Sequence, residues 1–240
     1  MTALASTGAH PASPRDVVAL QYGNPNRMVG VPLYILGGVV LLTVAISLTI
    51  VRAGGDLDDA DFNASVLYSV LGYTVAIGVQ NVSSSFPFAL ALGSTRSTFV
   101  LGNLLTSAAQ AVLVAVASVV LLGVEVATHG WFIGARALSP VLLGAGNPVV
   151  LGGVMLLATL TALSVGGVFG SSYVRFGARG PLCVGVGIAV VIVLLLLLLV
   201  PQAPAVASAF RPWWLAVGGA AVIGLSAVGQ YLLLRRASVR

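Results

Sequence analysis

Six long apolar runs constrain this chain more than any other feature of its sequence. The clearest is LCVGVGIAVVIVLLLLLLV at 182–200, and the others lie at 29–52, 64–82, 98–123, 149–170 and 213–234. A helix needs about 20 predominantly apolar residues to cross about 30 Å of hydrocarbon. Backbone polar groups in lipid must be paired within their own segment. The sequence therefore predicts an all-α membrane protein with six transmembrane helices.

The composition supports this interpretation. Only 7% of the 240 residues are charged, 58% are hydrophobic and the mean hydropathy is +1.07, whereas soluble domains carry about 25% charged residues. The net charge of +5 comes from arginines around the apolar runs, and the chain has no lysine. We interpret this charge as a membrane feature and expect a lipid bilayer, with no nucleic acid, among the partners. The rich use of Ala, Gly, Val and Arg favours a bacterial plasma membrane.

The arginines also predict the orientation of the six spans. Cytoplasmic loops of membrane proteins carry an excess of basic residues. A cytoplasmic N-terminus leaves three arginines outside (Arg52, Arg136 and Arg211) and eight inside (Arg15, Arg27, Arg96, Arg175, Arg179, Arg235, Arg236 and Arg240). We therefore expect both termini to be cytoplasmic. The predicted parts are an N-terminal segment at 1–28, a six-helix transmembrane domain at 29–234 and a tail at 235–240.

One helix start is visible within the N-terminal segment. Ser13, Pro14 and Asp16 match the residues preferred at the N-cap, first and third positions of a helix. The following VVALQY is semi-apolar, so it fits an interfacial helix lying along the inner membrane surface. A frayed tail with a single helical turn fits equally well.

The sequence lacks the residues that several classes of enzyme require. A phosphate-binding loop needs a lysine, so this chain cannot carry one. No zinc-protease or serine-hydrolase motif occurs, and the single cysteine, Cys183, has no partner for an internal disulfide. Ion-coupled carriers usually place an ionisable group at mid-membrane, and the only candidate here is Glu125, at the outer end of the third span. We expect no catalytic residue, metal or cofactor on this chain.

Polar groups inside the spans leave two interpretations open. Amides and hydroxyls of this kind form hydrogen bonds between helices or line a substrate path. The candidates are Tyr68, Tyr73, Gln80, Asn103, Gln110 and Gln230. Gly166 and Gly170 form a G-x-x-x-G pattern, which indicates close helix contact.

The outer segment at 124–148, VEVATHGWFIGARALSPVLLGAGNP, fits neither a span nor a free loop. Its Gly, Pro and charged residues break any helix long enough to cross the bilayer, yet much of it is apolar. We expect a re-entrant or surface-lying hairpin at the outer leaflet.

The stretch FPFALALGSTRSTFVLGNLL at 86–105 joins the second and third spans on the predicted cytoplasmic side. Serines at 83–85 suggest the end of a helix, Pro87 suits a first helical turn and Gly93 suits a left-handed turn after a helix. Ser94 or Thr95 then caps the next helix. These signals predict a short in-plane helix between the two spans.

This stretch resembles the segment after the second span in permease subunits of ABC transporters of the type-2 exporter class. Those chains show an apolar–LG–small–T/S–R–x–x–F–x–x–G pattern. The residues that match it are Pro87, Phe88, Leu92, Gly93, Thr95, Arg96, Phe99 and Gly102. One departure is that the family's outer helical insertion often follows the fifth span, whereas the bulky outer segment here follows the third.

The resemblance implies a coupling helix at 86–98 that docks on a separate cytoplasmic ABC ATPase. ATP and Mg would bind that partner, and a second permease copy or a paralogue would complete the path. The implied coupling residues are Phe86, Pro87, Phe88, Leu90, Leu92, Gly93 and Arg96. Without the resemblance, the stretch is an interfacial loop in which Arg96 only sets topology. The alternatives to an exporter subunit are a non-transporting scaffold or sensor and a carrier or channel acting alone.

Overall fold

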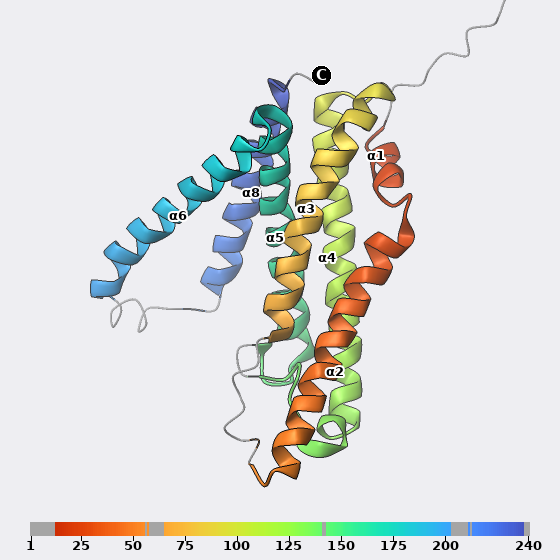
Figure 1. Cartoon of the computed structure of the whole chain (residues 1–240), viewed down its shortest axis with the longest axis vertical. Helices are drawn as coiled ribbons and strands as arrows, with labels where there is room; N and C mark the ends of the chain where they lie inside the picture. The colour runs from red at the N-terminus through yellow and green to blue at the C-terminus, as the bar shows by residue number, and fades with distance from the viewer. Residues whose placement is uncertain are drawn as a thin grey trace, which may run out of the picture.

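The apolar runs form long helices that pass up and down in alternation (Figure 1). This computed structural model describes residues 13–55, 57, 65–140, 143–202, 211 and 213–237. Six helices in these ranges are long and apolar enough to cross a membrane, which confirms the six predicted spans. The elements are α1 (Pro14–Gln21), η1 (Asn26–Gly30), α2 (Val31–Arg52), α3 (Ser65–Ala91), α4 (Arg96–Ala127), η3 (Gly130–Gly134), α5 (Pro148–Phe176), α6 (Arg179–Leu199), η5 (Val200–Gln202) and α8 (Trp213–Arg235).

The two ends of the bundle differ in what they carry. The arginine-rich end, at the top of Figure 1, holds α1, the turns at 92–95 and 177–178, and the last turn of α8. The opposite end, which we call the loop end, holds the connection between α4 and α5. Asp56, Asp58, Asp59, Asp61 and Arg240 lie outside the described residues.

The structure corrects the prediction of a separate in-plane helix. Helix α3 runs without a break through Pro87 and ends at Ala91. The serines at 83–85 continue the helix, and the Ser84 hydroxyl donates to the Gln80 carbonyl one turn earlier instead of capping a helix end. Pro87 removes one backbone hydrogen bond, but one missing bond does not end a helix that is packed on its neighbours. Residues 86–91 are therefore the last turns of α3.

Helix α5 is central because it contacts α3, α4, α6 and α8. Its contact with α3 is close: a Cβ on Gly166 would lie 2.3 Å from the Val75 carbonyl oxygen. A Cβ on Gly170 would lie 2.5 Å from the carbonyl oxygen of Val79. Small residues allow helix backbones to approach in this way. The prediction of close helix contact at Gly166 and Gly170 is confirmed.

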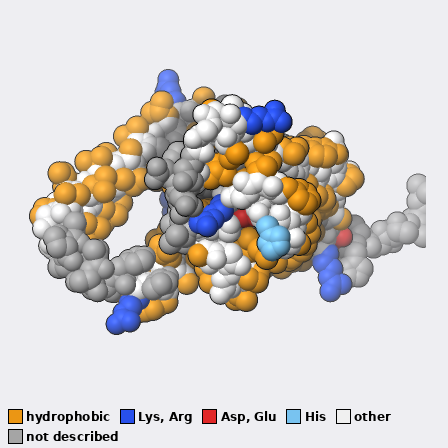
Figure 2. Space-filling model, turned by 90° about the horizontal axis from the view of Figure 1, so that it is seen from below, with side chains coloured by type: hydrophobic (Ala, Val, Ile, Leu, Met, Phe, Trp, Pro, Cys, Tyr) orange, Lys and Arg blue, Asp and Glu red, His pale blue; other side chains and the backbone are white. Residues whose placement is uncertain are grey.

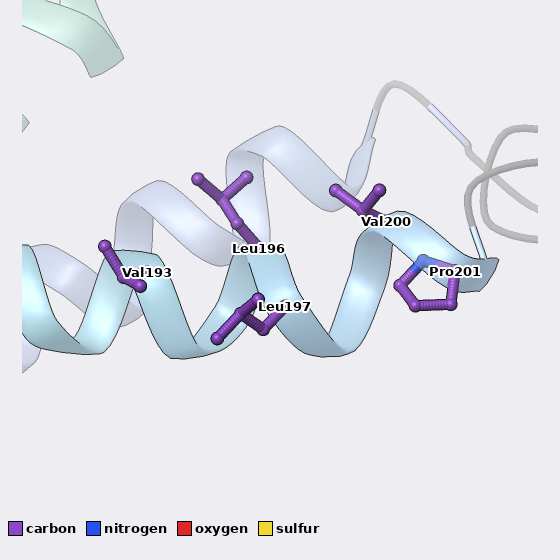
Figure 3. Close-up of a pocket in the computed structure, with 5 residues that line it drawn as sticks. All are labelled: Val193, Leu196, Leu197, Val200 and Pro201. Carbon is purple, nitrogen blue, oxygen red and sulfur yellow. The ribbon is translucent and has the colours of Figure 1, made fainter.

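Helix α6 contacts α5 at its start and then diverges from the bundle (Figure 1). At the contact, a Cβ on Gly180 would lie 2.2 Å from the Ser172 carbonyl oxygen. Further along, no residue in the most apolar stretch of α6 is buried. Figure 3 shows the far end of the helix, where a hollow of about 290 Å³ is lined by Val193, Leu196, Leu197, Val200 and Pro201 alone. This hollow is a surface feature of one helix and not a site between elements.

Candidate functional site

The turn between α3 and α4 is a compact connection at the arginine-rich end. Gly93 has φ +84°, and the N–H of Ser94 donates to the Ala89 carbonyl at 2.9 Å. These features form the turn that commonly closes a helix on a glycine. The Thr95 hydroxyl then accepts from the Thr98 N–H at 3.1 Å and caps α4. The predicted roles of Gly93 and Thr95 are confirmed.

Arg96 follows this cap and binds the end of α8. Its Nη1 donates to the Leu234 carbonyl at 3.0 Å and to the Arg235 carbonyl, while Nη2 donates to the Ala237 carbonyl at 2.9 Å. The last carbonyls of a helix have no partner within it and favour a cation nearby. Arg96 is therefore a clamp between the start of α4 and the end of α8.

Phe86 lies in the interior. Its ring meets the ring of Phe99 edge to face at a centroid distance of 5.1 Å, and both side chains are fully buried. Val17 of α1 and Leu234 of α8 belong to the same apolar cluster. The prediction that Phe86 belongs to a contact surface is therefore wrong for this structure, because the chain's own helices cover the ring.

Two other predicted contact residues remain on the surface. Phe88 is 66% exposed and Leu92 is 69% exposed, and the four-residue spacing places them on one side of the end of α3. Pro87 and Leu90 are half-buried. Within residues 86–98, the exposed large apolar side chains are this pair, Phe88 and Leu92.

Gly102, the last glycine of the matched pattern, lies in close contact with α1. A Cβ on Gly102 would lie 2.5 Å from the Val17 Cβ and 2.9 Å from the Pro14 carbonyl oxygen. Helix α1 begins as predicted after Ser13, whose N–H donates to the Asp16 carboxylate at 2.7 Å. It packs against α4, so α1 is part of the bundle.

Below the turn, a chain of buried amides joins five helices. Gln21 Nε2 donates to Asn103 Oδ1 at 3.1 Å and to the Asn81 carbonyl at 3.3 Å. Asn103 Nδ2 donates to Gln230 Oε1 at 3.0 Å, and Gln230 Nε2 donates to the Ser164 carbonyl at 3.2 Å. Of the two interpretations left open, interhelical hydrogen bonding describes Asn103 and Gln230 in this structure. Sequence reasoning missed Gln21, although its spacing of four from the apolar Val17 places both on one helix face.

Of the remaining residues predicted for a substrate path, Gln80 and Tyr73 both contact Arg27. Gln80 accepts from Arg27 Nη2 at 2.7 Å, and the Tyr73 hydroxyl donates to the Arg27 carbonyl at 3.2 Å. Tyr68 is exposed, and Gln110 is buried with its Oε1 unpaired.

At the loop end, the Glu125 carboxylate organises the segment that follows α4. It accepts from the N–H groups of Ala137 at 3.1 Å and Leu138 at 2.9 Å. It also accepts from the Ser139 hydroxyl at 2.5 Å and from Trp131 Nε1 at 3.2 Å. Buried charges need such partners. The predicted outer hairpin is, in its described residues, a cap folded back on the bundle, with Ala137 and Leu138 in the main apolar cluster.

A small polar cavity of about 230 Å³ lies beside this carboxylate. Glu125, His129, Arg136 and Ser139 are among the residues that line it. Figure 2 looks onto the loop end and shows charged and histidine side chains near the centre, with hydrophobic side chains around the flanks. Within the described ranges, no group of three or more His, Cys, Asp or Glu residues is placed to hold a metal ion.

The chain was compared with family models, curated proteins and solved structures. No family model, curated protein or solved structure matches the chain. The class rests on the six helices in the described residues that are long and apolar enough to cross a membrane, which indicate a multi-pass helical membrane protein.

Proposed function

We propose that this chain is the membrane-spanning permease subunit of an ATP-driven ABC exporter in a bacterial plasma membrane. A separate cytoplasmic ATPase would bind at the turn between α3 and α4. The observation that carries this proposal is the exposed apolar pair, Phe88 and Leu92, beside the capped turn at the arginine-rich end. Basic residues favour the cytoplasmic side, which is where an ATPase would be met.

The contacts behind this pair support a coupling role. Arg96 ties the start of α4 to α8, Phe86 packs on Phe99, and Gly102 receives α1. A displacement of the turn would therefore move the ends of α1, α3, α4 and α8 together. Packed interfaces transmit such shifts because they change between discrete arrangements.

The nucleotide site belongs on the partner in this proposal. The sequence has no lysine for a phosphate-binding loop, so ATP and Mg would bind the ATPase. A second copy of this chain, or a paralogue, would enclose the substrate path between two permeases.

The proposal is tested by co-expressing the tagged chain with the ABC ATPase of the adjacent reading frame. We expect the ATPase to co-purify with the wild-type chain and to be lost from Phe88→Asp, because a carboxylate on an apolar contact must be desolvated. The matched control is Phe132→Asp. Phe132 is also an exposed phenylalanine, 86% accessible, but lies at the loop end. This control should retain the ATPase.

Two results would overturn the proposal. One is the absence of an ABC ATPase gene beside this reading frame together with no co-purifying ATPase. The other is equal loss of the ATPase from both aspartate variants while both remain folded by circular dichroism.

A second candidate, a membrane sensor that does not transport, is favoured by the polar cavity beside Glu125. A sensor would bind a small polar ligand there from the loop end. Arg136→Gln would then abolish a ligand-induced change in the tryptophan fluorescence of the cap, while leaving any ATPase bound. A chain that exports substrate only with its ATPase would exclude this candidate.

A further inference from the structure

A second cavity lies between α3, α5 and α8 and is larger than the polar one at the loop end. Its volume is about 420 Å³. The wall consists of apolar residues, one glycine and one threonine: Leu71, Val75, Val154, Leu157, Ala158, Thr161, Ala162, Val165, Leu215 and Gly219. The hydroxyl oxygen of Thr161 has almost no accessible surface. The surface that faces the cavity is therefore almost entirely hydrocarbon.

The cavity has the length of a lipid chain. Its lining follows one face of α5 from Val154 to Val165 at helical spacings of three and four. Eleven residues of helix rise about 16 Å, and one leaflet of a bilayer has about 15 Å of hydrocarbon depth. An apolar cavity of about 150 Å³ takes a benzene ring, so on that scale 420 Å³ holds roughly 17 carbon atoms.

The position of the cavity within the bundle indicates how a bound hydrocarbon chain would be oriented. Leu215 lies close to the start of α8, and Leu71 lies less than two turns into α3, so the cavity begins near the loop end. Leu215 is itself 59% exposed, which leaves the cavity open on the α8 side. The medium at that opening is the bilayer, because α3, α5 and α8 are all long and apolar enough to span it.

We propose that this cavity is a binding site for one hydrocarbon chain of a membrane amphiphile, with its headgroup at the loop end. Water would be unfavourable there because a buried water needs two to four polar partners. The site does not depend on the proposed coupling to an ATPase.

The test is photolabelling of the purified full chain with palmitic acid that carries a diazirine. A probe with the diazirine near the carboxyl group should label α5 near Val154, and a probe labelled at the chain end should label near Val165. Unlabelled palmitate should compete, because a single site saturates. Ala158→Phe should lower the apparent affinity about tenfold, the loss expected if a ring displaces about two methylenes.

The matched control is Ala189→Phe on α6, which faces the surroundings along its whole apolar length. It should leave the labelling of α5 unchanged. Thr161→Val should also have no effect, because the Thr161 hydroxyl oxygen has almost no accessible surface for a ligand to contact. Labelling that spreads evenly over α5 and α6 and resists competition would overturn the proposal. The competition experiment remains decisive if Ala158→Phe fails to fold. A second copy of this chain is the other possible occupant. If Ala158→Cys crosslinks two chains and the crosslinked protein no longer binds the probe, the cavity is an interface between copies and the proposal is overturned.

Discussion

Helices α3 and α6 stand at the two extremes of this bundle. By mean hydropathy α3 is the least apolar of the six spans and α6 the most apolar. Yet 44% of the most apolar stretch of α3 is buried, against 0% for α6. In lipid an apolar side chain gains little by leaving the hydrocarbon, so helices associate through small residues and hydrogen bonds. Helix α3 has both, at Gly78 and Asn81, whereas α6 has one close contact, at Gly180.

The largest effect that would test this comparison is a single added methyl group. Gly166→Ala places a Cβ 2.3 Å from the Val75 carbonyl oxygen, and a backbone atom cannot move aside as a side chain can. We expect unfolding free energy to fall by about 3 kcal/mol. Gly187→Ala on α6 is the control, since nothing lies within 4 Å of its added Cβ. Unfolding in mixed micelles measures both, and equal stability of the two variants would contradict close packing of α3 on α5.

A pair of leucines tests the same contrast without adding atoms. Leu163→Ala on α5 removes a side chain that is 1% exposed and packs with Met28 and Ile77. We expect a loss of about 2 kcal/mol from the cavity left behind. Leu196→Ala on α6 removes a side chain that is half exposed, and its effect should stay within about 0.5 kcal/mol. A large loss at Leu196 in the same unfolding assay would show that α6 is packed by a partner.

The amide network should contribute less than the glycine contacts. Asn103→Leu removes the hydrogen bonds to Gln21 and Gln230, and bonds of this kind in membranes average about 0.6 kcal/mol each. We expect a total loss of about 1–2 kcal/mol, since the orphaned amides add a further cost. Gln80→Leu is the exposed-amide control: it removes one solvent-exposed hydrogen bond, from Arg27, and should cost less than about 1 kcal/mol. If both variants unfold alike, the network does not hold the five helices together.

The smallest effect concerns the clamp at the arginine-rich end. Arg96→Gln weakens the interaction with the last carbonyls of α8, a helix-end contribution of about 1 kcal/mol. Hydrogen exchange should become faster in residues 232–237 and stay unchanged in α5. Arg179→Gln, an exposed arginine at the start of α6, provides the control. Unchanged exchange in Arg96→Gln would mean that other contacts hold the end of α8.

Several local features could be predicted because local chemistry produces them. The six spans follow from the length of apolar runs, and the helix starts after Ser13 and Thr95 follow from side chains that cap backbone N–H groups. The turn at Gly93 could be predicted because glycine adopts a positive φ without a steric cost, and the observed φ is positive. The predicted break at residues 83–85 failed because serine signals a helix end only when no packed neighbour favours continuation.

What the sequence determined by itself was therefore the set of spans, their caps and the absence of a phosphate-binding lysine, because each depends on residues next to one another in the chain. The tertiary structure alone decided that Arg96 binds the end of α8, that Phe86 is buried, and that Gln21, Asn103 and Gln230 meet. These contacts join residues up to 141 positions apart. Hydropathy cannot reveal these contacts, because any apolar face of a helix can lie against lipid. The side chains that touch are determined by how the helices cross.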